Sequence, residues 1–108
     1  MPKYMIQGSY TSEGIKGLVK DTASGRKAAV QAAMKSVKGK LESLHFALGS
    51  DDIVAIVDAP DNISMAALAL GIGQSGLINT RTTALLTVDE VDQALALSTK
   101  YRAPGQDK

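Results

Sequence analysis

The sequence predicts an α+β fold built on a four-stranded antiparallel sheet, and three observations predict it. Lys3 to Tyr10 and Lys40 to Leu48 alternate between apolar and polar residues with the period of two that is typical of strands. Two segments with helical periodicity follow the first and the third strand. Ile53 to Val57 is apolar at every position, which indicates a central strand with both faces covered.

The first strand is expected over Lys3 to Tyr10, and Thr11 or Ser12 is expected to cap the helix that follows. An apolar stripe beginning at Ile15 is interrupted by the turn-forming segment 21–25 and resumes from Val30 onward. We therefore expect a long helix with a break near Ser24-Gly25. Gly39 is expected to end this helix.

The middle of the chain reads as two strands joined by a tight turn. Leu44, Phe46 and Leu48 alternate with Ser43, His45 and Ala47, and Gly49-Ser50-Asp51-Asp52 supplies the turn before Ile53 to Val57. Pro60 ends that strand, and Asp61 or Asn62 caps a second helix that is apolar nearly all round.

The last elements are a strand and a helix. Leu77 to Thr87 is rich in Thr, Ile and Leu, and Thr87-Val88-Asp89-Glu90 has the form of a capping box that opens a third helix. The order is therefore βαββαβ with one C-terminal helix added, which is the ferredoxin-like unit. We expect a single domain over residues 1–98 and a flexible tail over residues 99–108.

Composition limits the classes of function. The net charge is +1, from 12 basic and 11 acidic residues, which disfavours nucleic acid as a partner. The absence of cysteine removes thiolate chemistry and Cys-based zinc sites and suits a reducing compartment, so a cytoplasmic location is expected. No secretory signal is apparent at the start of the chain, and no apolar stretch predicts a membrane span.

The sheet face opposite the two helices is expected to need a partner. In a single copy it would leave half of the apolar strand Ile53 to Val57 in water, and a second subunit packed on it removes that exposure. We therefore expect a homodimer or a higher oligomer, with two sheets paired face to face into an α/β barrel.

Several segments resemble the GYD family of small bacterial and archaeal proteins, which is similar to the dimeric α/β-barrel group. The resemblance rests on Thr11 through Gly14-Ile15, on Gly39-Lys40-Leu41 and above all on LGSDDIVAIVDAPDN from Leu48 to Asn62. The name-giving motif differs, because Asp51 stands where the family has tyrosine, whereas Gly49 and Asp52 match. The resemblance implies the fold and the barrel; it implies no particular activity, since the wider group includes cofactor-independent monooxygenases, isomerases, haem-handling enzymes and binding domains.

Residues 71–76 match the dinucleotide-binding pattern G-x-G-x-x-G. That pattern binds pyrophosphate only where it joins a strand to the start of a helix. Here it is expected to follow a helix and to precede a strand, so a structural connection is the better interpretation and no cofactor is expected.

Five polar residues are candidates for binding a ligand on the sheet face opposite the two helices: Gln7, Ser9, Ser43, His45 and Arg81. Together they offer a guanidinium, an imidazole and hydroxyls, which can orient a small carboxylate or carbonyl compound. His45 and Arg81 are also the candidate catalytic residues. The structural alternatives are that His45 faces solvent and that Arg81 is a charge on an edge strand that discourages aggregation. No metal site is expected, because no other His, Asp or Glu accompanies His45 at the spacing of metal ligands.

Asp51, Asp52 and Asp58 are acidic residues close together in the sequence. We expect the two turn residues to serve turn geometry through hydrogen bonds to the backbone. The leading functional hypothesis is a homo-oligomeric domain that binds a small molecule or a partner without catalysis. The alternatives are a cofactor-independent monooxygenase or isomerase, with His45 and Arg81 in a pocket between sheet and helices, and haem or metal binding through His45.

Overall fold

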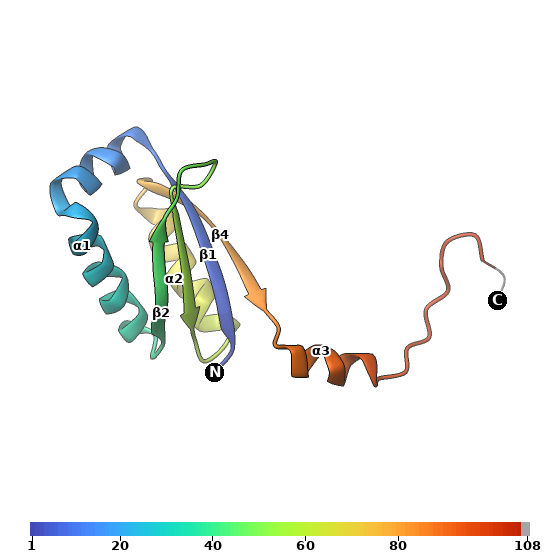
Figure 1. Ribbon diagram of the computed structural model, residues 1–108. Coiled ribbons are helices and arrows are strands. Elements are labelled where there is room, and N and C mark those ends of the chain that lie inside the picture. The colour runs from blue at the N-terminus through green and yellow to red at the C-terminus, as the bar shows by residue number, and fades with distance from the viewer. Residues whose placement is uncertain (107–108) are drawn as a thin grey trace.

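The computed structural model describes residues 1–106 of the 108-residue chain. Residues 107 and 108, the end of the predicted tail, lie outside the described residues. Figure 1 shows the elements in their chain order: β1 (Lys3–Tyr10), α1 (Ser12–Ser36), β2 (Lys40–Phe46), β3 (Ile53–Asp58), α2 (Asn62–Gln74), β4 (Ile78–Leu85) and α3 (Val88–Leu95).

The four strands form one antiparallel sheet in the order β2-β3-β1-β4. This confirms the α+β fold with the ferredoxin-like order of elements and places β2 and β4 at the two edges. α1 contacts β1 and β2, whereas α2 contacts β4, so the two helices divide the covering of the sheet between them. The dimeric barrel stays a prediction, because a single chain does not test it.

The core lies between the helices and one face of the sheet. Tyr4 from β1, Ala55 and Val57 from β3, Met34 from α1 and Met65 from α2 are all buried, and Met34 and Val57 are fully enclosed. Apart from Tyr4, small aliphatic side chains and flexible methionines fill this core, in keeping with a composition that contains few aromatic residues.

α1 is broken at Thr22, two residues before the predicted position. Thr22 has a φ of 70°, which a β-branched residue rarely adopts. Its hydroxyl accepts a hydrogen bond from the backbone N–H of Gly25 at 3.3 Å. The threonine thus caps the second half of the helix, and for this reason the break lies at Thr22 and not at the glycine.

Gly39 follows the end of α1 but does not adopt the left-handed conformation that a glycine cap provides. Lys38 does so instead, with a φ of 60°. A Cβ at Gly39 would lie 2.6 Å from the carbonyl oxygen of Asp58. The glycine is needed because the chain passes close to the end of β3 as it enters β2.

α2 begins at its N-cap Asp61 and contains no charged residue. The glycine-rich segment 71–76 forms its C-terminal end and the turn into β4, where Gly76 has a φ of +69°. The segment therefore lies between a helix and a strand, as predicted. Among residues 1–106, no helix combines the length and the hydropathy needed to cross a bilayer.

The segment after β4 projects away from the rest of the molecule (Figure 1). Thr87 and Glu90 form the predicted capping box at the start of α3. Residues 86–102, called here the C-terminal arm, are exposed at every position. The predicted boundary between domain and tail at residue 98 stays a prediction, but the unbroken run of exposed residues already begins at Leu86.

Candidate functional site

The face of the sheet that α1 and α2 leave uncovered is called here the open face. Core residues such as Tyr4, Ala55 and Val57 point to the helices, so the alternate residues of each strand point to the open face. Its central strands contribute the half-buried residues Met5, Gln7, Ser9, Val54 and Ile56. The edge strands contribute Ser43 and His45 on β2 and Asn79, Arg81 and Thr83 on β4.

Strand register aligns three of the predicted site residues. His45 pairs with Val54, Val54 pairs with Gln7, and Gln7 pairs with Arg81. These four residues therefore form one row across the whole open face. Since neighbouring strands lie about 4.8 Å apart, the backbones of His45 and Arg81 are separated by about 14 Å. The two candidate catalytic residues share a face, yet they stand at its opposite edges.

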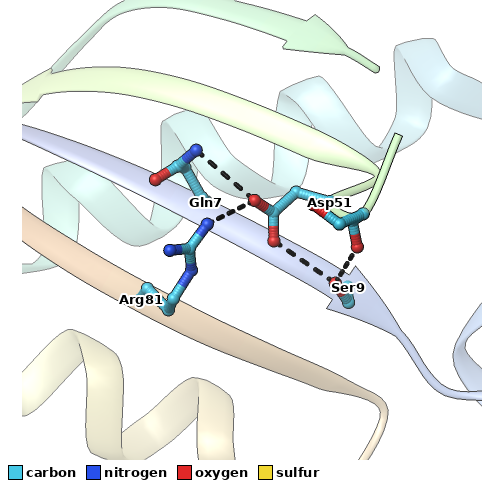
Figure 2. A network of polar contacts seen from close by, with 5 residues as sticks. Gln7, Ser9, Asp51 and Arg81 are labelled. Atoms are coloured by element: carbon cyan, nitrogen blue, oxygen red, sulfur yellow. Dashed lines mark hydrogen bonds and ion pairs between the residues drawn. The ribbon is translucent and has the colours of Figure 1, made fainter. Parts of the chain in front are cut away.

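Asp51 is the centre of a polar network on this face (Figure 2). Its Oδ2 lies 2.5 Å from Nη2 of Arg81 and accepts a longer hydrogen bond, of 3.4 Å, from Nε2 of Gln7. Its Oδ1 accepts a hydrogen bond of 3.4 Å from the hydroxyl of Ser9. The network thus gathers Gln7, Ser9 and Arg81, three of the five predicted binding residues, around a carboxylate from the β2–β3 loop.

The loop that carries Asp51 is fixed at both ends. The backbone N–H of Ala47 donates to the carbonyl of Asp52 at 2.8 Å, and the N–H of Asp52 donates to the carbonyl of Gly8 at 2.7 Å. The carboxylate of Asp52 accepts the N–H of Tyr10 at 2.8 Å. Asp52 therefore ties the loop to β1, which leaves Asp51 free to reach across the open face.

Asp51 and Arg81 differ in exposure. The Asp51 side chain is 16% exposed, whereas the Arg81 side chain is 65% exposed. A guanidinium carries five N–H donors in a planar fork. Asp51 contacts one of its terminal nitrogens, Nη2, and the exposure of the side chain leaves the other donors of Arg81 accessible to solvent.

A second charged group lies at the opposite end of the open face. Nζ of Lys3 contacts the carboxylates of Glu42 at 2.5 Å and Asp58 at 2.9 Å. Hydrogen bonds from the ammonium to Glu42 and then to Asp58 raise the pKa of Lys3 above its ordinary value. Glu42 reaches Lys3 because the register of β2 shifts between Leu41 and Ser43. Lys3 is thus already paired with two acids and is a poor candidate for binding an anion.

The hollow between sheet and helices does not contain the candidate catalytic residues. It has a volume of about 110 Å³ and is mostly apolar, with Tyr10 and Arg26 among its lining residues. Leu44, Ile53 and Thr80 line it as well, so their strand neighbours His45, Val54 and Arg81 point the other way. The hypothesis that placed His45 and Arg81 in a pocket on the helix side is therefore wrong about that position.

Ser43 and His45 stand apart from the Asp51 network, on β2. His45 is exposed, and Ser43 is half-buried. Within residues 1–106, no group of three or more His, Cys, Asp or Glu side chains is arranged to hold a metal ion. The structure thus brings Gln7, Ser9 and Arg81 into contact with one carboxylate and leaves Ser43 and His45 at the far edge.

Asp51 is the member of the network that sequence reasoning missed. It was expected to shape the turn through backbone hydrogen bonds, and Asp52 has that role instead. The available signal was the departure from the family motif at position 51, where an acid replaces an aromatic ring. Arg81 in β4 is the cation that accounts for an acid at this position.

A family model described as the GYD domain matches residues 4–95, which span all seven elements apart from the first residue of β1. This confirms the resemblance drawn from the sequence. Searches of curated proteins and of solved structures gave no match.

Proposed function

The chain belongs to the GYD domain family, and we propose that it acts as a homo-oligomeric domain that binds a small carboxylate without catalysing a reaction. Two copies pair through their open faces, and the ligand lies between them. The observation that carries the proposal is the solvent-accessible guanidinium of Arg81, paired with Asp51, beside an uncovered apolar strand surface.

The pairing of two copies is supported by the centre of the open face. Met5 pairs with Ile56, and Val54 lies two residues along β3 on the same face. Within residues 1–106, α1 and α2 pack on the opposite face of the sheet. Sheets that pack face to face bury side chains of this kind in a layer about 10 Å thick. A second copy supplies such a layer with the same residues, related by two-fold symmetry.

Binding of a carboxylate is supported by the chemistry around Arg81. Arginine binds carboxylates through two parallel N–H···O hydrogen bonds. Asp51 orients the guanidinium, and Gln7 adds an amide in the same row of the sheet. Enclosure by a second copy would exclude water and strengthen these interactions. The polar edge of each open face thus provides the specificity, and the apolar centre provides the contact between copies.

Calorimetric titration with benzoate, acetate and the neutral analogue benzamide tests the ligand class. We expect benzoate or acetate to bind the native chain and benzamide to bind at least ten-fold more weakly. Arg81→Gln should weaken carboxylate binding by at least ten-fold, whereas Arg26→Gln, which changes an arginine on the helix side, should leave it unchanged. Equal binding by Arg81→Gln and the native chain, or no binding of either carboxylate, would overturn the proposal.

A cofactor-independent monooxygenase or isomerase acting on a small carbonyl or carboxylate compound is the second candidate function. It is favoured by the row that places His45 and Arg81 on the same face. With about 14 Å between their backbones, a small substrate bound at Arg81 meets an imidazole only if a second copy brings one close. The test is turnover of a small carbonyl or carboxylate compound by the native chain. If His45→Ala abolishes this turnover but still binds carboxylates, the enzyme is favoured over the binding domain.

Haem or metal binding through His45 stays a prediction of lower rank, because within residues 1–106 no group of three or more His, Cys, Asp or Glu side chains could hold a metal ion. Freshly purified protein without a Soret band and without bound metal would refute it.

A further inference from the structure

Besides the centre of the open face, two further apolar surfaces of the described chain have no cover, and they meet at the end of β4. The first is the outer side of α2, where Ile63 is 80% exposed and Leu70 is 74% exposed. The second is the C-terminal arm, which contributes six of the large exposed apolar side chains: Leu86, Val88, Val91, Leu95, Leu97 and Tyr101. Contiguous exposed apolar surface of this kind marks an interaction site.

The arm is built as an amphipathic helix. Val88, Val91 and Leu95 recur at the spacing i, i+3, i+7 and therefore form one stripe along α3. Asp89 and Gln93 lie on the opposite side. The capping box of Thr87 and Glu90 stabilises the start of the helix without any help from the sheet. α3 thus presents a formed apolar stripe that its own domain does not cover.

The corner between α2 and β4 offers a matching surface. A hollow of about 230 Å³ lies there, and small side chains on both elements leave it shallow: Ala66 and Ala69 from α2, and Thr82 and Ala84 from β4. Ile63 and Leu70 belong to the same helix, and α2 carries no charge. Such a corner suits the apolar stripe of a short helix, whose acidic residues would remain in water.

We propose that the arm of one copy packs into the corner between α2 and β4 of a second copy, and that the second copy returns the same contact. The arm begins at the end of β4, the edge strand that α2 contacts, two residues after Ala84 of the corner, and it then projects away from its own domain (Figure 1). A two-fold axis beside this edge lets two chains exchange arms in a closed contact. This contact is separate from the pairing of open faces and does not depend on it.

The area of the exchange is sufficient for a stable contact. Burying a fully exposed Val or Leu side chain removes roughly 60–120 Å² of apolar surface. The six apolar side chains of each arm are 41% to 82% exposed, so two arms give about 500–1,000 Å². The matching surface of two α2 helices adds to this figure. The total reaches the range of about 1,200–2,000 Å² that is typical of stable interfaces.

Cross-linking tests the exchange directly, because the native sequence contains no cysteine. Chains carrying Ala66→Cys are mixed with chains carrying Leu95→Cys and treated with a short bis-maleimide. We expect a cross-linked heterodimer. The matched control replaces Leu95→Cys with Gln93→Cys, on the opposite side of α3, and should give at most a tenth of the product. Equal products from both mixtures, or none from either, would overturn the proposal.

A chain that carries both Ala66→Cys and Leu95→Cys separates exchange from folding back. Cross-links within single chains only, at any protein concentration, would show that the arm packs on its own domain and would contradict the exchange.

Sedimentation in a background of Ile56→Asp separates this contact from the pairing of open faces. In that background, Val91→Lys with Leu95→Lys should weaken self-association by at least ten-fold, and Asp89→Lys with Gln93→Lys should leave it unchanged. Equal association in both pairs of variants would refute the arm contact, whatever becomes of the open face.

Discussion

Asp51 and Arg81 meet across the open face, with Oδ2 of the carboxylate 2.5 Å from Nη2 of the guanidinium. The acid comes from the β2–β3 loop and the base from the edge strand β4, so the pair spans the width of β1. Only the acid is well shielded from solvent, since its side chain is 16% exposed against 65% for the arginine. The pair therefore orients Arg81 more than it stabilises the fold.

A double-mutant cycle of Asp51→Asn and Arg81→Gln measures this relationship. We expect a coupling free energy of about 0.5–1 kcal/mol in urea unfolding, because solvent screens a pair with one exposed partner. High salt should reduce the coupling. The pair of Glu13 and Lys16, in which both side chains are more than 70% exposed, is the control and should give a coupling near zero. The same small value for both pairs would show that Asp51 does not hold Arg81.

Gly14 and Gly17 give a matched test of how α1 meets the start of β4. A Cβ at Gly14 would lie 1.9 Å from the carbonyl oxygen of Leu77, whereas a Cβ at Gly17 meets nothing within 4 Å. Gly14→Ala should lower the free energy of unfolding by about 3 kcal/mol, because backbone atoms have to move. Gly17→Ala should raise it by about 0.5–1 kcal/mol, since alanine favours the helix.

Urea unfolding of the two variants measures the difference. Equal stability of Gly14→Ala and Gly17→Ala would contradict the close approach of α1 to Leu77.

The N-cap of α2 predicts a dependence of stability on pH. Asp61 accepts the backbone N–H of Ser64 at 2.8 Å, and this hydrogen bond lowers the pKa of its carboxyl below the ordinary value of 3.8. A lowered pKa in the folded state stabilises the protein above the unfolded pKa, and this contribution is lost as the pH falls through the folded value. The loss should therefore occur below about pH 4.

Asp61→Asn isolates that contribution, because asparagine caps a helix about as well as aspartate but does not titrate. Melting temperatures measured from pH 7 to pH 2 should fall less steeply for Asp61→Asn than for the native chain. Parallel curves for the two proteins would show that the carboxylate of Asp61 has no special role.

Periodicity and capping residues were sufficient to predict most of the fold. Thr11, Asp61 and Thr87 are the N-caps of the three helices, and each was among the predicted caps. β1 has its predicted bounds. These features depend on neighbours in the sequence, which is why a single sequence contains them. The break in α1 lies at Thr22 and not at the predicted Ser24-Gly25. Its position depends on the hydrogen bond to the Thr22 hydroxyl, which the composition of the segment does not show.

The candidate site was predicted only in part. Alternation along the strands placed Gln7, His45 and Arg81 on one face, and strand register aligns them in one row. The contact between Asp51 and Arg81 joins residues 30 positions apart, so local patterns do not show it. The helix in the C-terminal arm was predicted from its capping box. Its separation from the sheet was not, because periodicity does not show whether a helix packs on its own domain.

Sedimentation equilibrium at micromolar concentration tests the pairing of open faces most directly. The substitutions Val91→Lys and Leu95→Lys remove any arm contact. The chain that carries them should still sediment at twice the 11.3 kDa of a single copy. Adding Ile56→Asp, which places a charge in the centre of the open face, should reduce it to a monomer that keeps its circular dichroism spectrum. Adding Val19→Asp instead, at a residue that is 76% exposed on α1, should leave the dimer intact. A monomer before Ile56→Asp is introduced would contradict the account.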